Sequence, residues 1–139
     1  MTTIAPKYAA SKLAETTKAE YLKIITDYLM QNQAYQQPDL TIKKLAQQVD
    51  LPRHQVSQVI NEKTGSNFTE FINQYRIQAA KELLIAPEAA ELPTIAIGRK
   101  VGFKAQSTFY AVFKKYTQQS PAAFRKANYG VTSSARDSP

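Results

Sequence analysis

The sequence of 139 residues contains no cysteine and only one histidine, His54. Without cysteine it can form neither disulfides nor thiolate metal sites, and one histidine is too few for a histidine-based metal site. The four glycines are isolated from one another, so there is no glycine-rich phosphate-binding loop. Glu88 and Glu91 are better explained as a solvated linker than as paired catalytic carboxylates. We therefore expect no metal, no cofactor and no enzymatic activity.

Long hydrophobic runs are absent as well. No stretch of eighteen apolar residues occurs, and residues 1–6 lack the charged and apolar regions of a signal peptide. We expect a cytoplasmic protein. Whether an intact parent protein is anchored in a membrane through a missing N-terminal sensor stays open.

Acidic residues are missing from one long segment. Residues 1–91 hold ten Lys/Arg and ten Asp/Glu, whereas residues 92–136 hold eight Lys/Arg and no acid. A field of one sign attracts a polyanion, which is either nucleic acid or an anionic membrane. A basic but merely solvated surface is the alternative.

The apolar periodicity predicts an all-α protein of about seven helices, with no strand-like alternation. Capping boxes are predicted at Thr17–Glu20 and Asn67–Glu70, and Ser120 is predicted to cap the last helix. The helices are expected at about residues 17–33, 42–49, 53–64, 68–85, 94–100, 106–116 and 121–127. Their predicted apolar faces are Tyr21, Ile24, Ile25, Tyr28 and Leu29 in the first helix, and Phe68, Phe71, Ile72, Tyr75, Ala79 and Leu83 in the longest.

One pattern occurs twice, at residues 40–65 and 94–116. Leu45 and Ala46 align with Ile97 and Gly98 at an offset of 52, and the later positions align at an offset of 53. Each copy has two short helices joined by a turn. The second helix of each copy has an apolar inner face and a polar outer face: Val56, Val59 and Ile60 point inward in the first copy, and Phe109, Val112, Phe113 and Tyr116 in the second. This is the layout of a helix-turn-helix whose second helix enters the major groove of DNA.

The repeat sets the expected domain organisation. We expect a flexible lead-in at residues 1–16, a double helix-turn-helix domain at 17–127 and a disordered tail at 128–139. Within the domain, 17–66 form the first unit, 67–86 a linker helix and 87–127 the second unit.

These residues resemble the DNA-binding domain of the AraC/XylS family of transcription regulators, over about residues 17–127. The matching motifs include Val56-Ser-Gln-Val-Ile-Asn-Glu, Ala80-Lys-Glu-Leu-Leu84, Val101-Gly-Phe and Ser107-Thr-Phe-Tyr. The resemblance implies two helix-turn-helix units joined by a long helix. It also implies binding to double-stranded promoter DNA, with RNA polymerase recruited or blocked.

The resemblance also implies which residues contact DNA. Family base contacts come from the outer face of each recognition helix, and Lys suits phosphate. The base contacts fall on Arg53, His54, Ser57, Gln58, Gln106, Ser107, Tyr110 and Ala111. The expected phosphate contacts are Thr41, Lys104, Lys114 and Lys115.

Several positions depart from the family pattern. Ala111 stands where the family often has Arg, and Pro52 and Ala105 stand where it usually has a capping Ser. Pro52 can serve as the first helical residue instead. Gln118 replaces a Gly in a left-handed position. We therefore expect the first unit to read bases and the second to depend more on charge.

The predicted function is sequence-specific DNA binding by a bacterial transcription regulator. The eighteen residues 68–85 make a helix of about 27 Å, which suits grooves about 34–36 Å apart once helix widths are added. The expected site is asymmetric and about 15–20 base pairs long. A basic membrane-surface or protein-interaction module is the alternative. We expect an isolated monomer that lacks its effector or sensory domain, and the sequence leaves open whether it is stand-alone or excised.

Overall fold

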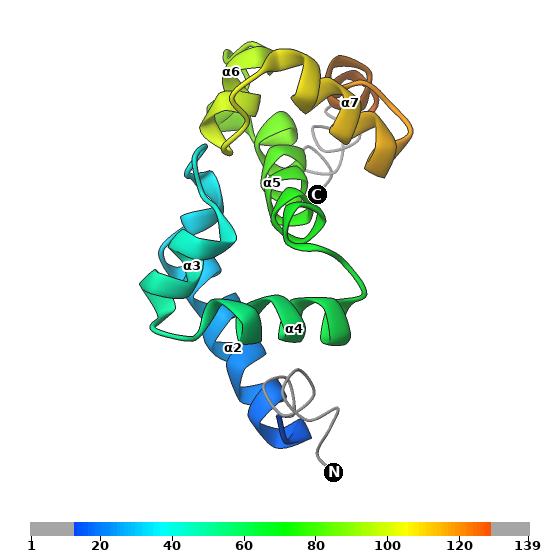
Figure 1. Cartoon of the computed structure of the whole chain (residues 1–139). Helices are drawn as coiled ribbons and strands as arrows, with labels where there is room; N and C mark the ends of the chain where they lie inside the picture. The colour runs from blue at the N-terminus through cyan, green and yellow to red at the C-terminus, as the bar shows by residue number, and fades with distance from the viewer. Residues whose placement is uncertain (1–12, 129–139) are drawn as a thin grey trace, which may run out of the picture. The chain divides into compact units, whose positions relative to one another are not determined.

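The computed structural model describes residues 13–128, which form seven α-helices, two short 3-10 helices and no strand (Figure 1). The predicted all-α class is confirmed. The helices are α2 (Glu15–Gln31), α3 (Ile42–Val49), α4 (Arg53–Thr64), α5 (Phe68–Ile85), α6 (Thr94–Lys100), α7 (Gln106–Thr117) and a last helix at 121–128. The 3-10 helices are η1 (Ala34–Gln36) and η2 (Pro87–Ala89).

The first helix begins earlier than predicted. Its N-cap is Ala14, which makes no side-chain cap hydrogen bond, so the predicted capping box at Thr17–Glu20 is wrong. The acidic side chain of Glu15 in the first turn complements the helix dipole there. The helix ends at Gln31, two residues before the expected Gln33. The predicted lead-in and tail lie largely outside the described residues.

The other predicted helix ends are confirmed. Asn67 and Glu70 bond reciprocally, because each backbone amide donates to the other's side chain at 3.0 and 2.8 Å. The Ser120 hydroxyl oxygen accepts from the Ala123 amide at 3.1 Å. Gly65 and Gln118 both end their helices in the left-handed region, with φ of 73° and 66°.

The described chain divides into two compact units, residues 13–34 with 39–72 and residues 35–38 with 73–128. In the first unit, α4 lies across α2 and packs on α3 (Figure 1). Its largest fully buried side chains come from all three helices, so each helix contributes to one shared core. The largest of them are Ile25, Leu29, Leu45, Val56, Val59 and Ile60.

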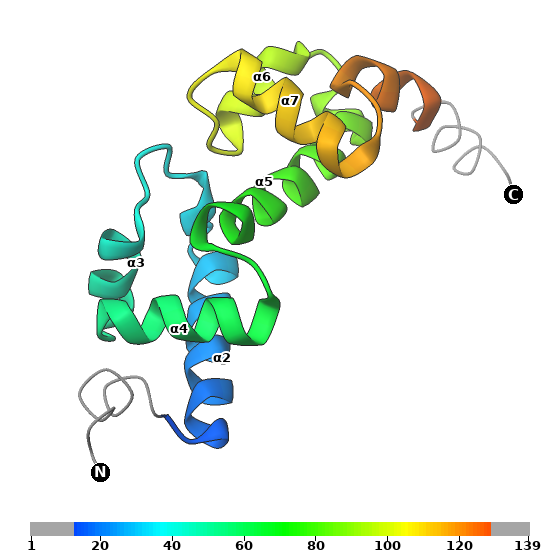
Figure 2. The ribbon, with the colours of Figure 1, turned by 45° about the vertical axis from the view of Figure 1, so that its right-hand side comes forward.

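The second unit has its own core, in which α7 packs over α6 (Figure 2). Phe109 lies at the centre of this core, since its ring centroid is 5.2 Å from that of Phe103 and 5.8 Å from that of Phe113. At Gly98 of α6 an added Cβ would collide with the Phe109 ring, so only glycine allows this close approach. The cluster consists of Ile77, Ala80, Leu84, Ile97, Val101, Phe103, Phe109 and Phe113.

Two predicted core residues lie at the surface. Ile24 is 43% exposed and Tyr116 is 38% exposed. The side chain of Tyr116 instead lies beside Lys115, whose Nζ is 5.6 Å from the ring centroid. Both corrections have one cause: each helix packs against its neighbours over a narrower face than its apolar residues cover.

The buried face of α5 also differs from the predicted stripe. Phe71 and Ile72 are buried as expected, whereas the predicted Phe68, Tyr75, Ala79 and Leu83 are only half-buried. The second unit instead buries Ile77, Ala80 and Leu84. The helix begins in one unit and ends in the other, so a single apolar stripe does not describe it.

Arg76 has a structural role within the second unit. Its guanidinium donates to the carbonyl oxygens of Tyr35 at 2.6 Å and Gln37 at 2.8 Å. It also lies 5.6 Å from the ring centroid of Phe103. Burial lowers the pKa of Arg76, and the two carbonyls offset part of that desolvation. All four residues belong to the second unit, so Arg76 holds residues 35–37 to it.

Candidate nucleic-acid interface

The first candidate recognition helix is α4. Arg53 and His54 are exposed in its first turn, and Ser57 and Gln58 are half-buried one turn further on. The structure therefore brings all four predicted base contacts together on one helix. Pro52 is the N-cap, with φ −63° and ψ 136°, rather than the first helical residue as predicted.

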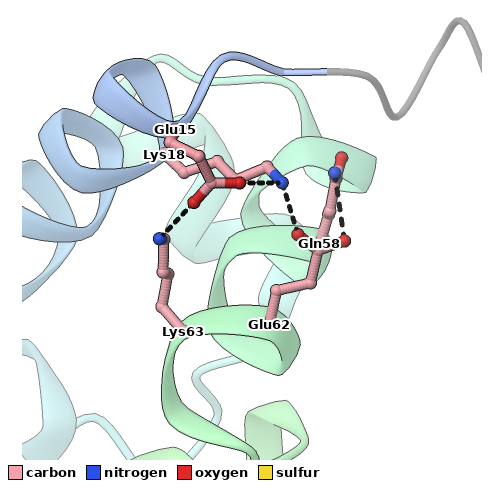
Figure 3. A network of polar contacts seen from close by, with 5 residues as sticks. All are labelled: Glu15, Lys18, Gln58, Glu62 and Lys63. Carbon is pink, nitrogen blue, oxygen red and sulfur yellow. Dashed lines mark hydrogen bonds and ion pairs between the residues drawn. The ribbon is translucent and has the colours of Figure 1, made fainter.

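A network of polar side chains joins α4 to the start of α2 (Figure 3). Gln58 Nε2 donates to Glu62 Oε2 at 3.2 Å, and the other oxygen of Glu62 accepts from Lys18 Nζ at 2.6 Å. Lys18 also bonds Glu15 at 3.1 Å, and Lys63 bonds the second oxygen of Glu15 at 2.6 Å. Five side chains thus form one continuous chain of contacts within the first unit.

The network shifts the titration of its members. Hydrogen bonds from Lys63 and Lys18 lower the pKa of Glu15, and a hydrogen bond from Lys18 lowers the pKa of Glu62. The hydrogen bonds to Glu62 and Glu15 raise the pKa of Lys18. At neutral pH both carboxylates are therefore ionised and act only as acceptors.

The second candidate recognition helix is α7. Gln106, Ser107 and Ala111 are exposed on it, whereas Tyr110 is half-buried and packs against the second core. The Tyr110 hydroxyl lies 3.0 Å from that of Thr94 in α6. The N-cap residue Ala105 makes no side-chain hydrogen bond, because its methyl group has no acceptor atom. Three of the four predicted base contacts on α7 are therefore exposed, and the fourth, Tyr110, holds α7 against α6.

The predicted phosphate contacts are all exposed. Thr41 caps α3, and its hydroxyl oxygen accepts from the Lys44 amide at 3.1 Å. A hydroxyl that accepts in this way can still donate to a phosphate oxygen. Lys114 and Lys115 lie in the last turn of α7, where their charge complements the helix dipole. Lys104 lies in the turn before α7.

One cation of the acid-free segment is structural. The guanidinium of Arg125 donates to the carbonyl oxygens of Leu84 at 3.0 Å, Leu92 at 2.7 Å and Ala89 at 3.2 Å. These bonds connect the C-terminal end of α5 to η2 and to the segment before α6. Its charge still contributes to the field of the second unit, but its donors are used within the protein.

Within residues 13–128, no group of three or more His, Cys, Asp or Glu side chains could hold a metal ion. In the same part of the chain, every helix is too short or too polar to cross a membrane.

Comparison with known proteins identifies the fold and the domain. A family model described as a helix-turn-helix domain matches residues 45–127, which is more than half of the chain. The chain belongs to the AraC-type helix-turn-helix family of transcription regulators. The resemblance inferred from the sequence motifs is thereby confirmed, and the chain is a DNA-binding regulator domain of this type.

Three similar proteins illustrate the match. The arabinose operon regulatory protein of Escherichia coli is 32% identical over 76% of this chain and 33% of its own length. The bifunctional transcriptional activator/DNA repair enzyme AdaA of Bacillus subtilis is 32% identical over 78% of this chain and 48% of its own length. The C-terminal domain of AraT, a response regulator from Geobacillus stearothermophilus, superposes with a TM-score of 0.63, at 26% identity over 84% of this chain and 88% of that domain. The chain thus spans less than half of either curated relative.

The polar network was not predicted from the sequence. Part of it has a recognisable spacing, since Gln58 and Glu62 are four residues apart and Glu15 and Lys18 are three apart on their helices. The contacts between α2 and α4 join residues far apart in the chain, and no spacing rule connects them.

Proposed function

We propose that this domain binds double-stranded promoter DNA sequence-specifically, with α4 and α7 in successive major grooves of an asymmetric site. The observation that carries the proposal is the polar outer face of both helices, each backed by a fully apolar inner face. Arg, Gln, Ser and His on such a face offer the donors and acceptors that base edges require.

The length of α5 supports the use of two grooves. Its 18 residues give about 27 Å of helix. Two major grooves on one side of DNA lie about 34–36 Å apart. A connecting helix of this length suits two recognition helices one turn of DNA apart, and the expected site is about 15–20 base pairs long.

The two units differ in how they bind. The first has base-reading side chains on α4 and two acids paired with Lys18 and Lys63. The second has no acid after residue 91 until Asp137 and carries Lys104, Lys114 and Lys115 around α7. The first unit therefore supplies more of the sequence specificity, and the second supplies more of the salt-dependent affinity.

The wider role is also a proposal. One relative is named a regulator of an operon and another a response regulator. By analogy, this domain acts at a bacterial promoter, where it recruits or blocks RNA polymerase, and an effector or sensory domain controls it. The isolated domain binds as a monomer and carries out no catalysis.

A basic membrane-surface or protein-interaction module is the second candidate, favoured only by the acid-free segment. Binding to vesicles with a high content of phosphatidylserine distinguishes this candidate from the DNA-binding proposal. Vesicle binding that surpasses binding to a selected duplex at the same salt concentration contradicts the DNA proposal.

The unequal roles of the units are tested with Gln58→Ala and Gln106→Ala. Each variant is titrated with its selected duplex and with a scrambled duplex at a stated salt concentration. We expect Gln58→Ala to reduce the ratio of the two affinities by about fivefold or more, and Gln106→Ala to reduce it less. An equal loss in both variants contradicts the assignment.

A further inference from the structure

The recognition helix α4 carries an amide, that of Gln58, which bonds Glu62 on the same helix, and Glu62 is in turn bonded to Lys18 of α2. Glu62 is ionised and can only accept, so Gln58 must turn its amide nitrogen, not its carbonyl oxygen, toward that carboxylate. The carbonyl oxygen of Gln58 is buried. The chemistry of Glu62 therefore fixes which end of the Gln58 amide points inward.

Glu62 is itself held in place by α2. Lys18 Nζ lies 2.6 Å from Glu62 Oε1 and 3.1 Å from Glu15 Oε2, and the Lys18 side chain is only 12% exposed. Glu15 is fixed in turn by Lys63 at 2.6 Å. Figure 3 shows Lys18 between the two carboxylates, with Gln58 bonded to the other oxygen of Glu62. Because Lys18 Nζ is bonded to both Glu15 and Glu62, it restricts the movement of the Glu62 carboxylate.

Glutamine reads adenine with both ends of its amide, because the oxygen accepts from N6 and the nitrogen donates to N7. A buried carbonyl cannot take part in that pairing. An amide nitrogen has two hydrogens, so donation to Glu62 does not exhaust it. Guanine presents the acceptor O6 where adenine presents the N6 amino donor, so a donor directed at that position can bond guanine but not adenine.

We propose that Lys18 and Glu62 are positioning residues that hold Gln58 as a hydrogen-bond donor, so that α4 prefers guanine to adenine at the base pair it meets. The inference rests on the proposed function. It adds a specificity determinant that acts through Gln58 and includes a residue on α2, outside both recognition helices.

The test begins with the intact 139-residue chain and a random duplex library. Comparing the motif of the wild type with that of Gln58→Ala identifies the base pair that Gln58 contacts. Duplexes with each of the four base pairs at that position then give the preference. We expect the wild type to favour guanine over adenine by about fivefold, the value of one hydrogen bond.

Two variants should remove the constraint on the orientation of the Gln58 amide. In Glu62→Gln the side chain at 62 can donate as well as accept, so the Gln58 amide can turn, and the preference should fall to about twofold or less. Lys18→Met keeps the apolar stem and removes the ammonium, and should change the preference in the same direction. Lys23→Met is the matched control, because Lys23 pairs with Asp27 on α2 and takes no part in the network. It should lose the same general affinity through one lost charge and keep the guanine preference.

Modified bases check the chemistry directly. 7-deazaguanine lacks N7 and keeps O6, so the wild type should bind a duplex with this base at the contacted position about as well as one with guanine. Hypoxanthine keeps both major-groove acceptors and should bind like guanine.

A wild-type preference for adenine, or a guanine preference that survives in both Glu62→Gln and Lys18→Met, overturns the inference. The same holds if Lys23→Met changes the preference as strongly as Lys18→Met. Selection of no motif by the wild type is a different result, because it contradicts the proposed function itself.

Discussion

The phenol oxygen of Tyr110 on α7 lies 3.0 Å from the hydroxyl oxygen of Thr94 in the first turn of α6. The ring of Tyr110 also lies 5.8 Å from that of Phe109 in the core. A side chain that the sequence predicts as a base contact therefore also braces the recognition helix against its partner helix.

Replacing Tyr110 by Phe tests which role dominates. Tyr110→Phe should lower the free energy of unfolding by about 1 kcal/mol, since it removes one hydrogen bond and keeps the ring. DNA affinity should fall by less than about threefold, because the lost hydroxyl is already engaged within the protein. Denaturant unfolding and duplex titration measure the two effects. Thr94→Val should produce the same destabilisation, and the double variant should add little to it.

Ala111 offers a gain-of-function test. It is exposed on the outer face of α7, so Ala111→Arg places a long cation where the family often has one. A new phosphate contact should raise affinity and steepen the dependence of log K on log salt by about 0.9. Ala122→Arg on the last helix is the control, because it adds the same charge outside the recognition helix. Equal gains in both variants would assign the effect to net charge alone.

Gln118 has a left-handed backbone, with φ of 66°. Gln118→Gly should therefore stabilise the domain by about 1 kcal/mol, since glycine adopts this conformation without strain. Gln31→Gly at the end of α2 makes the same substitution in a helical residue and should be destabilising. Thermal unfolding of both variants measures the sign. A destabilised Gln118→Gly would mean that the Gln118 side chain, which donates to the Lys115 carbonyl at 3.2 Å, outweighs the strain.

The helices could be predicted closely because their signals are local. The reciprocal bonds of Asn67 and Glu70, and the left-handed stops at Gly65 and Gln118, depend on residues within one turn of each other. The inner face of α4 was predicted for the same reason, since one helical period determines it.

The errors have non-local causes. Helix α2 begins at Glu15, where that side chain is held by Lys63 of another helix rather than by a local cap. Arg76 binds carbonyls of residues 35 and 37, which no charge pattern reveals. For the site, the sequence predicted which residues share a recognition helix. It did not predict that Gln58 would bond Glu62, which Lys18 of α2 contacts, or that Tyr110 would bond Thr94 of α6.

The network in the first unit predicts a dependence of stability on pH. The pKa values of Glu15 and Glu62 are lowered from 4.5 in the folded state, so their contribution is present above that pH. It is lost as the pH falls through the lower folded values. The raised pKa of Lys18 works in the opposite direction, and its contribution is lost only as the pH rises beyond 10.5.

Glu62→Gln isolates the acidic part of this dependence. The midpoint of thermal unfolding should be lower in the variant than in the wild type at pH 7, and the difference should shrink as the pH falls below 4.5 and Glu62 becomes protonated. Glu88→Gln removes an exposed carboxylate outside the network and should show little difference at either pH. A difference for Glu62→Gln that stays the same from pH 7 down to pH 3 would mean that packing, not charge, causes it.

We propose that one chain reads two neighbouring grooves through α4 and α7. Selection from a random duplex library at a stated salt concentration tests it most directly. We expect an asymmetric motif of about 15–20 base pairs, with two half-sites centred about ten base pairs apart. A single short half-site, a palindrome or no enrichment would contradict it.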